Sequence, residues 1–66
     1  MSVPKWTGQL VGKMHNNSVT NIDLANELNC TVEYVSMVLN GKKTPANARE
    51  RFNRALTAIV EKRKEQ

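Results

Sequence analysis

Two short runs of apolar residues at helical spacing occupy the middle of the chain and are separated by a break at residues 29–31. The first run is Ile22, Leu24, Ala25 and Leu28, and the second is Val35, Val38 and Leu39. Because residues that recur at i, i+3 and i+4 line one face of a helix, each run predicts a short amphipathic helix. The pattern therefore predicts a helix, a tight turn and a second helix between residues 20 and 41.

Each predicted helix begins at a residue suited to capping. Thr20 stands three residues before Asp23, a spacing that permits a capping box. Thr31 can cap the second helix, and Glu33 in its first turn suits the helix dipole. Gly41 can end this helix, because glycine adopts a left-handed conformation without a Cβ penalty. The expected helices span residues 20–28 and 32–40.

Ala25 sets the distance between these two helices. It lies on the inward side of the first helix, where Val35 and Val38 of the second are spaced to reach it. Leu28 closes the cluster, and Cys30 in the turn can fill the gap between the helices. A bulky residue at position 25 is therefore expected to push the helices apart, at a cost of ~1–3 kcal/mol.

Two further apolar stripes flank this central unit. The first recurs every four residues, at Trp6, Leu10 and Met14. It predicts a helix that has Pro4 in its first turn and ends near residues 16–17. Gly8 and Gly12 lie four residues apart on one face of this helix, and we expect another helix to approach them closely.

The second flanking stripe has the spacing of an amphipathic helix at Phe52, Ala55, Leu56, Ile59 and Val60. Thr44 and Pro45 form a start signal, so we expect a helix from Pro45 to about Lys62. The charged residues 62–66 are expected to fray into solvent. A bend near Ala48 would instead divide this region into two helices.

These elements predict an all-α, compact domain of four helices, or five if the last helix is divided. A chain of 66 residues has room for one domain, and we expect residues 1–66 to form it. Aromatic residues make up only 5% of the chain, so the core must be mainly aliphatic. A core of this size is expected to supply about 3–5 kcal/mol of stability. The flanking helices should pack on each other and behind the central unit, which leaves the outer face of helix 32–40 free.

The charge balance favours an anionic partner. The net charge is +4 and the sequence pI is about 9.7, which suits a polyanion such as nucleic acid but also fits solvated lysines. Lys42 and Lys43, directly after helix 32–40, shift the balance towards nucleic acid. The single cysteine excludes an internal disulfide, and no apolar run approaches the roughly 18 residues of a membrane span. We therefore expect a cytoplasmic protein without a membrane partner.

An ordered set of residues in the central unit combines a small alanine, spaced aliphatic residues and a terminal Asn-Gly-Lys. The set is Asn21-x-x-Leu24-Ala25-x-x-Leu28-Asn29-Cys30-x-x-x-x-Val35-x-x-Val38-Leu39-Asn40-Gly41-Lys42. It resembles the phage repressor and Cro type (XRE-like) family of helix-turn-helix DNA-binding proteins. The resemblance implies a lambda-repressor-like fold and a small transcriptional regulator, such as a repressor, of a phage or mobile element in a bacterial cell or phage-infected host. Asn29 departs from the family, which usually has glycine in the turn, although asparagine is the next-best residue for positive φ.

The resemblance implies that helix 32–40 enters the major groove of double-stranded DNA and that its outward residues contact bases. Carried to this chain, the base-reading residues are Thr31, Val32, Glu33, Ser36 and Met37. Glu33 can accept a hydrogen bond from cytosine N4, and Val32 and Met37 can pack on a thymine methyl group. Ser36 can donate or accept, so it discriminates poorly. Two alternatives stay open, because Glu33 can serve only the helix dipole and Met37 can belong to a protein contact.

A second group of residues is expected to contact the DNA backbone, which is bound by cations, amides and helix N-termini. The candidates are Asn21, Tyr34, Asn40, Lys42, Lys43, Asn47 and Arg49. The alternative for the two lysines is a solvated loop. A homodimer on two half-sites is compatible with this interpretation, including one that forms only on DNA.

No set of residues indicates an enzyme. His15 has no second histidine or cysteine at ligand spacing, and Cys30 is expected to be a buried small apolar residue rather than a nucleophile. The sequence shows no catalytic cluster and no glycine-rich phosphate loop, so we expect no cofactor, metal or small-molecule ligand. The alternative to DNA binding is a protein-interaction module, of an anti-repressor or antitoxin-like kind, on the same scaffold. A contiguous apolar patch of Val32, Tyr34 and Met37 without surrounding positive charge would favour it.

Overall fold

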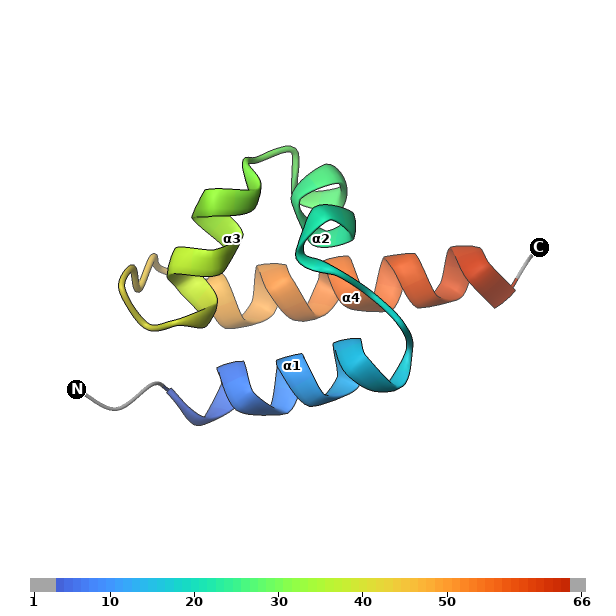
Figure 1. Cartoon of the computed structure of the whole chain (residues 1–66), viewed down its shortest axis with the longest axis horizontal. Coiled ribbons are helices and arrows are strands. Elements are labelled where there is room, and N and C mark those ends of the chain that lie inside the picture. The colour runs from blue at the N-terminus through green and yellow to red at the C-terminus, as the bar shows by residue number, and fades with distance from the viewer. Residues whose placement is uncertain (1–3, 65–66) are drawn as a thin grey trace.

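Residues 4–64 are described by the computed structural model, and within them the chain forms four α-helices without a strand (Figure 1). The helices are α1 (Lys5–Asn16), α2 (Asn21–Leu28), α3 (Val32–Leu39) and α4 (Ala48–Lys64). This confirms the expected all-α class with four helices, and α4 is one continuous helix rather than two. Among the described residues, no helix has both the length and the apolar character needed to cross a membrane.

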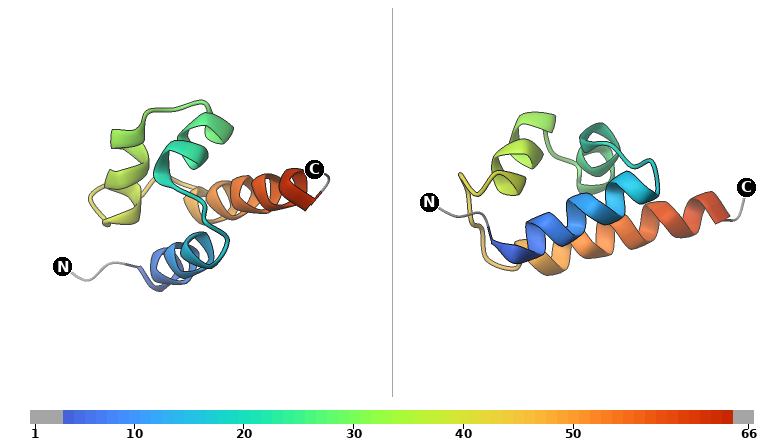
Figure 2. Two further views of the ribbon diagram at one scale, coloured as in Figure 1. Left: turned by 45° about the vertical axis from the view of Figure 1, so that its right-hand side comes forward. Right: turned by 60° about the horizontal axis from the view of Figure 1, so that its bottom comes forward.

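The helices α1 and α4 run side by side in the same direction, and α2 and α3 lie together against one side of them (Figures 1 and 2). α2 packs against both α3 and α4, and α3 also contacts α1. The first and last helices therefore pack on each other and behind α2 and α3, as expected. Because α3 packs against both α1 and α2, its position in the molecule is set by two neighbours.

The core between the helices is mainly aliphatic, as the composition predicts. Its most completely buried apolar side chains are Leu10, Leu24, Val35, Val38 and Phe52. The ring of Trp6 meets Phe52 edge-on, with ring centroids 6.0 Å apart and an interplanar angle of 73°. Ala25 is only 3% exposed in this core, on the helix α2 that packs against α3, so a larger side chain there would have to displace its neighbours.

Both predicted N-terminal caps are present. Thr20 forms a capping box with Asp23, because Thr20 N donates to Asp23 Oδ2 at 2.9 Å and Asp23 N donates to Thr20 Oγ1 at 3.3 Å. At the start of α3, Tyr34 N donates to Thr31 Oγ1 at 3.1 Å. Side-chain caps satisfy amides that have no partner in the first turn, so the start of each short helix is fixed.

The first three helices are followed by the same backbone motif, in which a residue with positive φ reverses the chain. These residues are Ser18, Asn29 and Gly41, with φ angles of 56°, 58° and 78°. In each case the following amide donates to the carbonyl oxygen five residues earlier: Val19 to Met14 at 2.8 Å, Cys30 to Ala25 at 2.9 Å, and Lys42 to Met37 at 2.9 Å. This hydrogen bond defines the Schellman motif. Asn29 thus adopts the left-handed conformation predicted for it.

Replacing Ser18 with glycine is expected to stabilise the fold by about 0.5–1 kcal/mol. At a φ of 56° the Cβ atom crowds the following carbonyl, a strain of ~1–2 kcal/mol that glycine avoids. The greater freedom of glycine in the unfolded chain removes part of this gain. Urea unfolding followed by circular dichroism measures the difference, and Ser18→Ala, which keeps the Cβ atom, is the matched control. Equal stability of the two variants would show that the strain argument is wrong.

α4 begins and ends later than the sequence predicts. Pro45 lies in the loop, and the helix begins at Ala48, whose amide donates to Pro45 O at 3.2 Å. Asn47 between them has a φ of 64°, which is incompatible with a helix that continues from Pro45. At the other end, residues 62–64 are helical rather than frayed, and residues 65 and 66 lie outside the described residues.

Two cations hold the last turn of α4 against the rest of the molecule. Lys62 Nζ lies 2.7 Å from Glu27 Oε1 of α2. The Arg63 guanidinium lies 3.4 Å from Asp23 Oδ2 and donates to two carbonyl oxygens of the α1–α2 turn, those of Asn17 and Ser18. Because the carbonyl acceptors belong to a fixed turn, these contacts explain why the last turn does not fray.

Two predictions about helix faces are wrong. Gly8 and Gly12 are exposed, and no heavy atom would lie within 4 Å of a Cβ atom added at either, so no other helix approaches them. Ile22 is 59% exposed, whereas Leu24 and Ala25 are buried. Successive helical residues are turned by about 100°, which places Ile22 on the far side of α2 from Leu24.

Candidate nucleic-acid interface

The outward side of α3 is accessible, while its other side is fixed in the core. The buried side consists of Val35, Val38 and Leu39. The predicted base-reading residues comprise three exposed ones, Thr31, Val32 and Glu33, and two half-buried ones, Ser36 and Met37. The structure therefore brings all five together on a rigid helix, next to its N-terminal cap and along its open face.

The N-terminal end of α3 presents the most accessible of these groups. Val32 is 38% exposed, although it is a large apolar residue. Glu33 is exposed and has no ion-pair partner among residues 4–64. The Thr31 hydroxyl oxygen accepts a hydrogen bond from the Tyr34 amide. The hydroxyl hydrogen of Thr31 therefore stays free to donate. Tyr34 is half-buried and packs against the core, at the flank of this surface.

Two of the predicted site residues are hydrogen-bonded to each other. Asn40 Nδ2 donates to Ser36 O at 2.8 Å and to Ser36 Oγ at 3.1 Å. The Ser36 hydroxyl therefore keeps one hydrogen to donate outward, and the Asn40 amide is partly used within the helix. Ser36 can still donate its hydroxyl hydrogen or accept a second hydrogen bond, so this pair does not decide how Ser36 would contact a base.

The loop after α3 places two cations close to the helix end. Lys42 and Lys43 are both exposed, and their backbone amides donate to Met37 O at 2.9 and 3.3 Å. These hydrogen bonds hold the backbone of both lysines against the last turn of α3, and so they set where the two side chains begin. The predicted neighbourhood of the lysines and α3 is therefore present.

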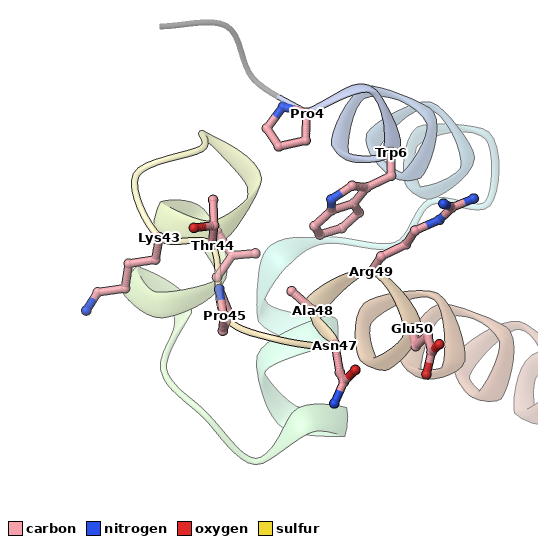
Figure 3. A pocket seen from close by; sticks show the side chains of 10 residues that line it. Pro4, Trp6, Lys43, Thr44, Pro45, Asn47, Ala48, Arg49 and Glu50 are labelled. Carbon is pink, nitrogen blue, oxygen red and sulfur yellow. The ribbon is translucent and has the colours of Figure 1, made fainter.

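The remaining backbone candidates are not all near α3. Asn47 is exposed on the loop, and Asn21 is half-buried at the start of α2. Arg49 is exposed in the first turn of α4, but its side chain extends past Trp6 towards α1, whereas Lys43 points away from Trp6 on the loop side (Figure 3). The structure therefore separates Arg49 from the lysine pair with which the sequence grouped it.

Most of the cations in residues 4–64 have no ion-pair partner within that range. Three pairs are present among residues 4–64: Lys62 with Glu27, Arg63 with Asp23, and Lys64 with Glu61. The chain has ten lysine and arginine residues, and the other seven have no ion pair in this part of the chain: Lys5, Lys13, Lys42, Lys43, Arg49, Arg51 and Arg54. Only two of the described carboxylates, Glu33 and Glu50, are unpaired. An approaching polyanion would therefore meet mostly uncompensated cations.

Sequence reasoning missed the residues that fix α2 from a distance. Arg63 and Lys62 are far from Asp23 and Glu27 in the sequence, and no local pattern pairs them. Only the arrangement of α4 beside α2 reveals the contacts. These cations act on α2 and the turn before it, rather than on the open face of α3.

The capping box lowers the pKa of Asp23. The main cause is the hydrogen bond from the Thr20 amide, followed by that from the Thr20 hydroxyl, while the Arg63 charge adds less and desolvation acts in the opposite direction. These donors favour the ionised carboxylate. The start of α2 is therefore most stable when Asp23 is charged.

Acid is expected to destabilise the protein partly through Asp23. Because the folded-state pKa lies below the unfolded value of about 3.9, the stabilisation is complete above that value and is lost as the pH falls through the folded-state pKa. Thermal unfolding of the wild type and of Asp23→Asn, measured from pH 7 to pH 2, tests this. The melting temperatures of the two should converge at low pH, and a constant difference would contradict the assignment.

Other candidate chemistry is weak in this part of the chain. Residues 4–64 contain no group of three side chains that could hold a metal ion. His15 is exposed in the last turn of α1, and Cys30 is half-buried against the core rather than fully buried. Comparison with protein-family models, with curated proteins and with solved structures finds no match. Functional inference therefore depends on the α3 surface and the charges around it.

Proposed function

We propose that the protein binds double-stranded DNA sequence-specifically by placing α3 in the major groove, and that it acts as a small transcriptional regulator of the phage repressor type. The observation that carries this proposal is the division of α3 into a buried side and an open side. The buried residues Val35 and Val38 hold the helix, while Thr31, Val32 and Glu33 are exposed at its start. A single helix fits the major groove, where base edges distinguish all four base pairs.

The charges around α3 support the same function. Lys42 and Lys43 stand at its C-terminal end on a fixed backbone, where they can bind phosphates on one side of the groove. Asn21 opens α2, whose first-turn amides can approach the opposite strand. Phosphate contacts of this kind orient a helix but carry no sequence information, so base choice falls to the open face of α3.

The side chains of that face suggest which bases are read. Val32 and Met37 can pack on thymine methyl groups, and Glu33 can accept from cytosine N4. Besides its bond from Asn40, the Ser36 hydroxyl keeps its hydrogen and one lone pair, so it can donate to guanine O6 or N7 or accept from a base amino group. These assignments rest on the proposed docking of α3.

Selection of binding sites from a pool of random DNA duplexes tests the proposal. We expect recovered duplexes to share a short motif, and a palindromic motif would indicate a dimer on two half-sites. Val32→Glu, which adds a charge to the α3 face, should abolish enrichment. Val11→Glu is the matched control, because Val11 is a similarly exposed valine (46%) on α1. Equal enrichment by both variants, or none by the wild type, would overturn the proposal.

Removing the Glu33 carboxylate is expected to change the preferred base at one position of the recovered motif. Each direct base contact contributes ~1–3 kcal/mol of discrimination, so the change should be visible in competition between single-base variants of the site. Glu50→Ala is the control, because Glu50 is also an unpaired carboxylate in the first turn of a helix. If Glu33→Ala only lowers thermal stability, as Glu50→Ala can, Glu33 serves the helix dipole instead.

The protein-interaction alternative on the α3 face receives no specific support. Of the three apolar residues that would form its patch, Tyr34 and Met37 are half-buried and only Val32 is exposed. Two exposed lysines stand beside them. This surface is therefore better suited to a groove with phosphates at its edges than to an apolar protein face.

A further inference from the structure

An apolar recess lies beside the proposed DNA-binding surface but does not belong to it. It has a volume of about 350 Å³ and opens between the start of α1, the loop after α3 and the first turn of α4 (Figure 3). Its apolar lining comprises Pro4, Trp6, Val38, Pro45 and Ala48. No local sequence pattern indicates this recess, because its residues come from the start of α1, from α3 and from the region around the start of α4.

The floor of the recess is the core itself. Val38 is 1% exposed and Ala48 is 5% exposed, and both belong to the buried cluster. Trp6 forms one wall, half-buried and held edge-on against Phe52. A side chain that entered the recess would therefore contact rigid apolar surface, which is how an anchor residue binds in a protein interface.

Two cations flank this apolar opening on different sides. Lys43 lies on the loop side with its ammonium group turned outward, and Arg49 extends on the α1 side of Trp6 (Figure 3). Neither has an ion-pair partner among the described residues. Glu50 is the one carboxylate in the lining and it points away from Trp6 (Figure 3). The recess thus has an apolar centre with an unpaired cation on each side, and its lining carries two cations against one carboxylate.

We propose that this recess is the docking site of an acidic protein segment that inserts one large apolar side chain, with carboxylates on either side of it pairing with Lys43 and Arg49. A DNA backbone would match the two cations but has no apolar group of this size to fill the space between them. The charge pattern and the apolar lining together therefore favour a protein partner over nucleic acid.

The occupant would also regulate DNA binding. Lys43 and Asn47 line the recess and are both candidates for phosphate contacts. An acidic segment seated there would occupy Lys43 and place carboxylates where phosphates must lie, so the two partners exclude each other. This part of the inference rests on the proposed DNA binding, whereas docking of the segment does not.

The single tryptophan of the chain makes the docking directly measurable. The probe is a blocked pentapeptide with two aspartates on each side of a phenylalanine, titrated without DNA while Trp6 emission is recorded. We expect a saturable blue shift, because the phenyl ring removes water from the indole. A peptide with serine in place of phenylalanine, and one with lysines in place of the aspartates, should give no shift.

Charge reversal separates the proposed site from general attraction to a basic protein. Arg49→Glu should weaken peptide binding about five- to tenfold, because it replaces an attraction between exposed charges with a repulsion. Arg54→Glu makes the same change at an exposed arginine that does not line the recess and should leave binding unchanged. Circular dichroism of both variants checks that the fold is kept.

Three results would overturn the inference. The first is the absence of a saturable shift with the phenylalanine peptide, and the second is equal weakening by Arg49→Glu and Arg54→Glu. The third is a Trp6 shift produced by duplex DNA but not by the peptide, which would make the recess part of the DNA interface.

In a separate titration with selected DNA, the peptide should displace the duplex, and a ternary complex would overturn the exclusion. Failure of the protein to bind any duplex would count against the proposed function alone, because the peptide titration contains no DNA.

Discussion

Phe52→Ala is expected to leave the protein largely unfolded at 25 °C. The Phe52 ring is 1% exposed at the centre of the core and supports Trp6 by edge-on contact. Truncation of a buried phenylalanine to alanine typically costs ~3–5 kcal/mol, through lost apolar burial and the cavity that remains. A domain of this size has only about 3–5 kcal/mol to lose. Far-ultraviolet circular dichroism and urea unfolding measure the outcome.

Two control variants test whether the loss of stability comes from the core. Phe52→Leu keeps most of the apolar volume and should unfold cooperatively with a smaller loss, of about 1 kcal/mol. Arg54→Ala removes an exposed side chain from the same helix and should behave as the wild type. A cooperative transition for Phe52→Ala within about 1 kcal/mol of the wild type would show that the core does not depend on this ring.

Replacing both Lys42 and Lys43 with alanine should weaken binding to every duplex and flatten its salt dependence. Each phosphate contact contributes a slope of about −0.9 to the plot of log K against log salt concentration. Loss of two contacts should therefore change the slope by about 1.8 while sequence preference is kept. Fluorescence anisotropy with a selected duplex and with an unrelated one, from low to moderate salt, measures both effects.

A second double variant controls for net charge. Arg51→Ala with Arg54→Ala removes the same number of unpaired cations from α4, where they lie near Leu28 rather than α3. The proposed geometry predicts that this variant keeps nearly the full salt slope. Equal flattening by the two double variants would mean that the protein is attracted only by its overall charge, and the placement of α3 in the groove would then be wrong.

The central helices could be predicted from the sequence because their boundaries are set locally. Thr20 and Thr31 cap neighbouring amides, and Asn29 and Gly41 each reverse the chain with their own backbone, so α2 and α3 agree with prediction to within a residue at each end. The open face of α3 could also be predicted, because helical periodicity is a local property of the sequence. The hydrogen bond between Asn40 and Ser36 could also have been predicted, since residues four apart are neighbours on the surface of a helix.

The differences between prediction and structure have different causes. Thr44 and Pro45 resemble a helix start, but the left-handed Asn47 delays α4 to Ala48 and sends Arg49 towards α1. Gly8 and Gly12 suggested a helix contact, although each is two residues from the buried Leu10 and therefore lies on the opposite side of α1. The recess beside Trp6 needs three segments at once, so no local pattern could reveal it.

The hydrogen bonds of Arg63 link the last turn of α4 to the turn between α1 and α2, two places that are distant along the chain. Its guanidinium joins the end of α4 to the carbonyl groups that immediately precede α2. Opening of the turn before α2 would therefore break contacts of α4 as well, which couples the leading end of α2 to the last turn of α4.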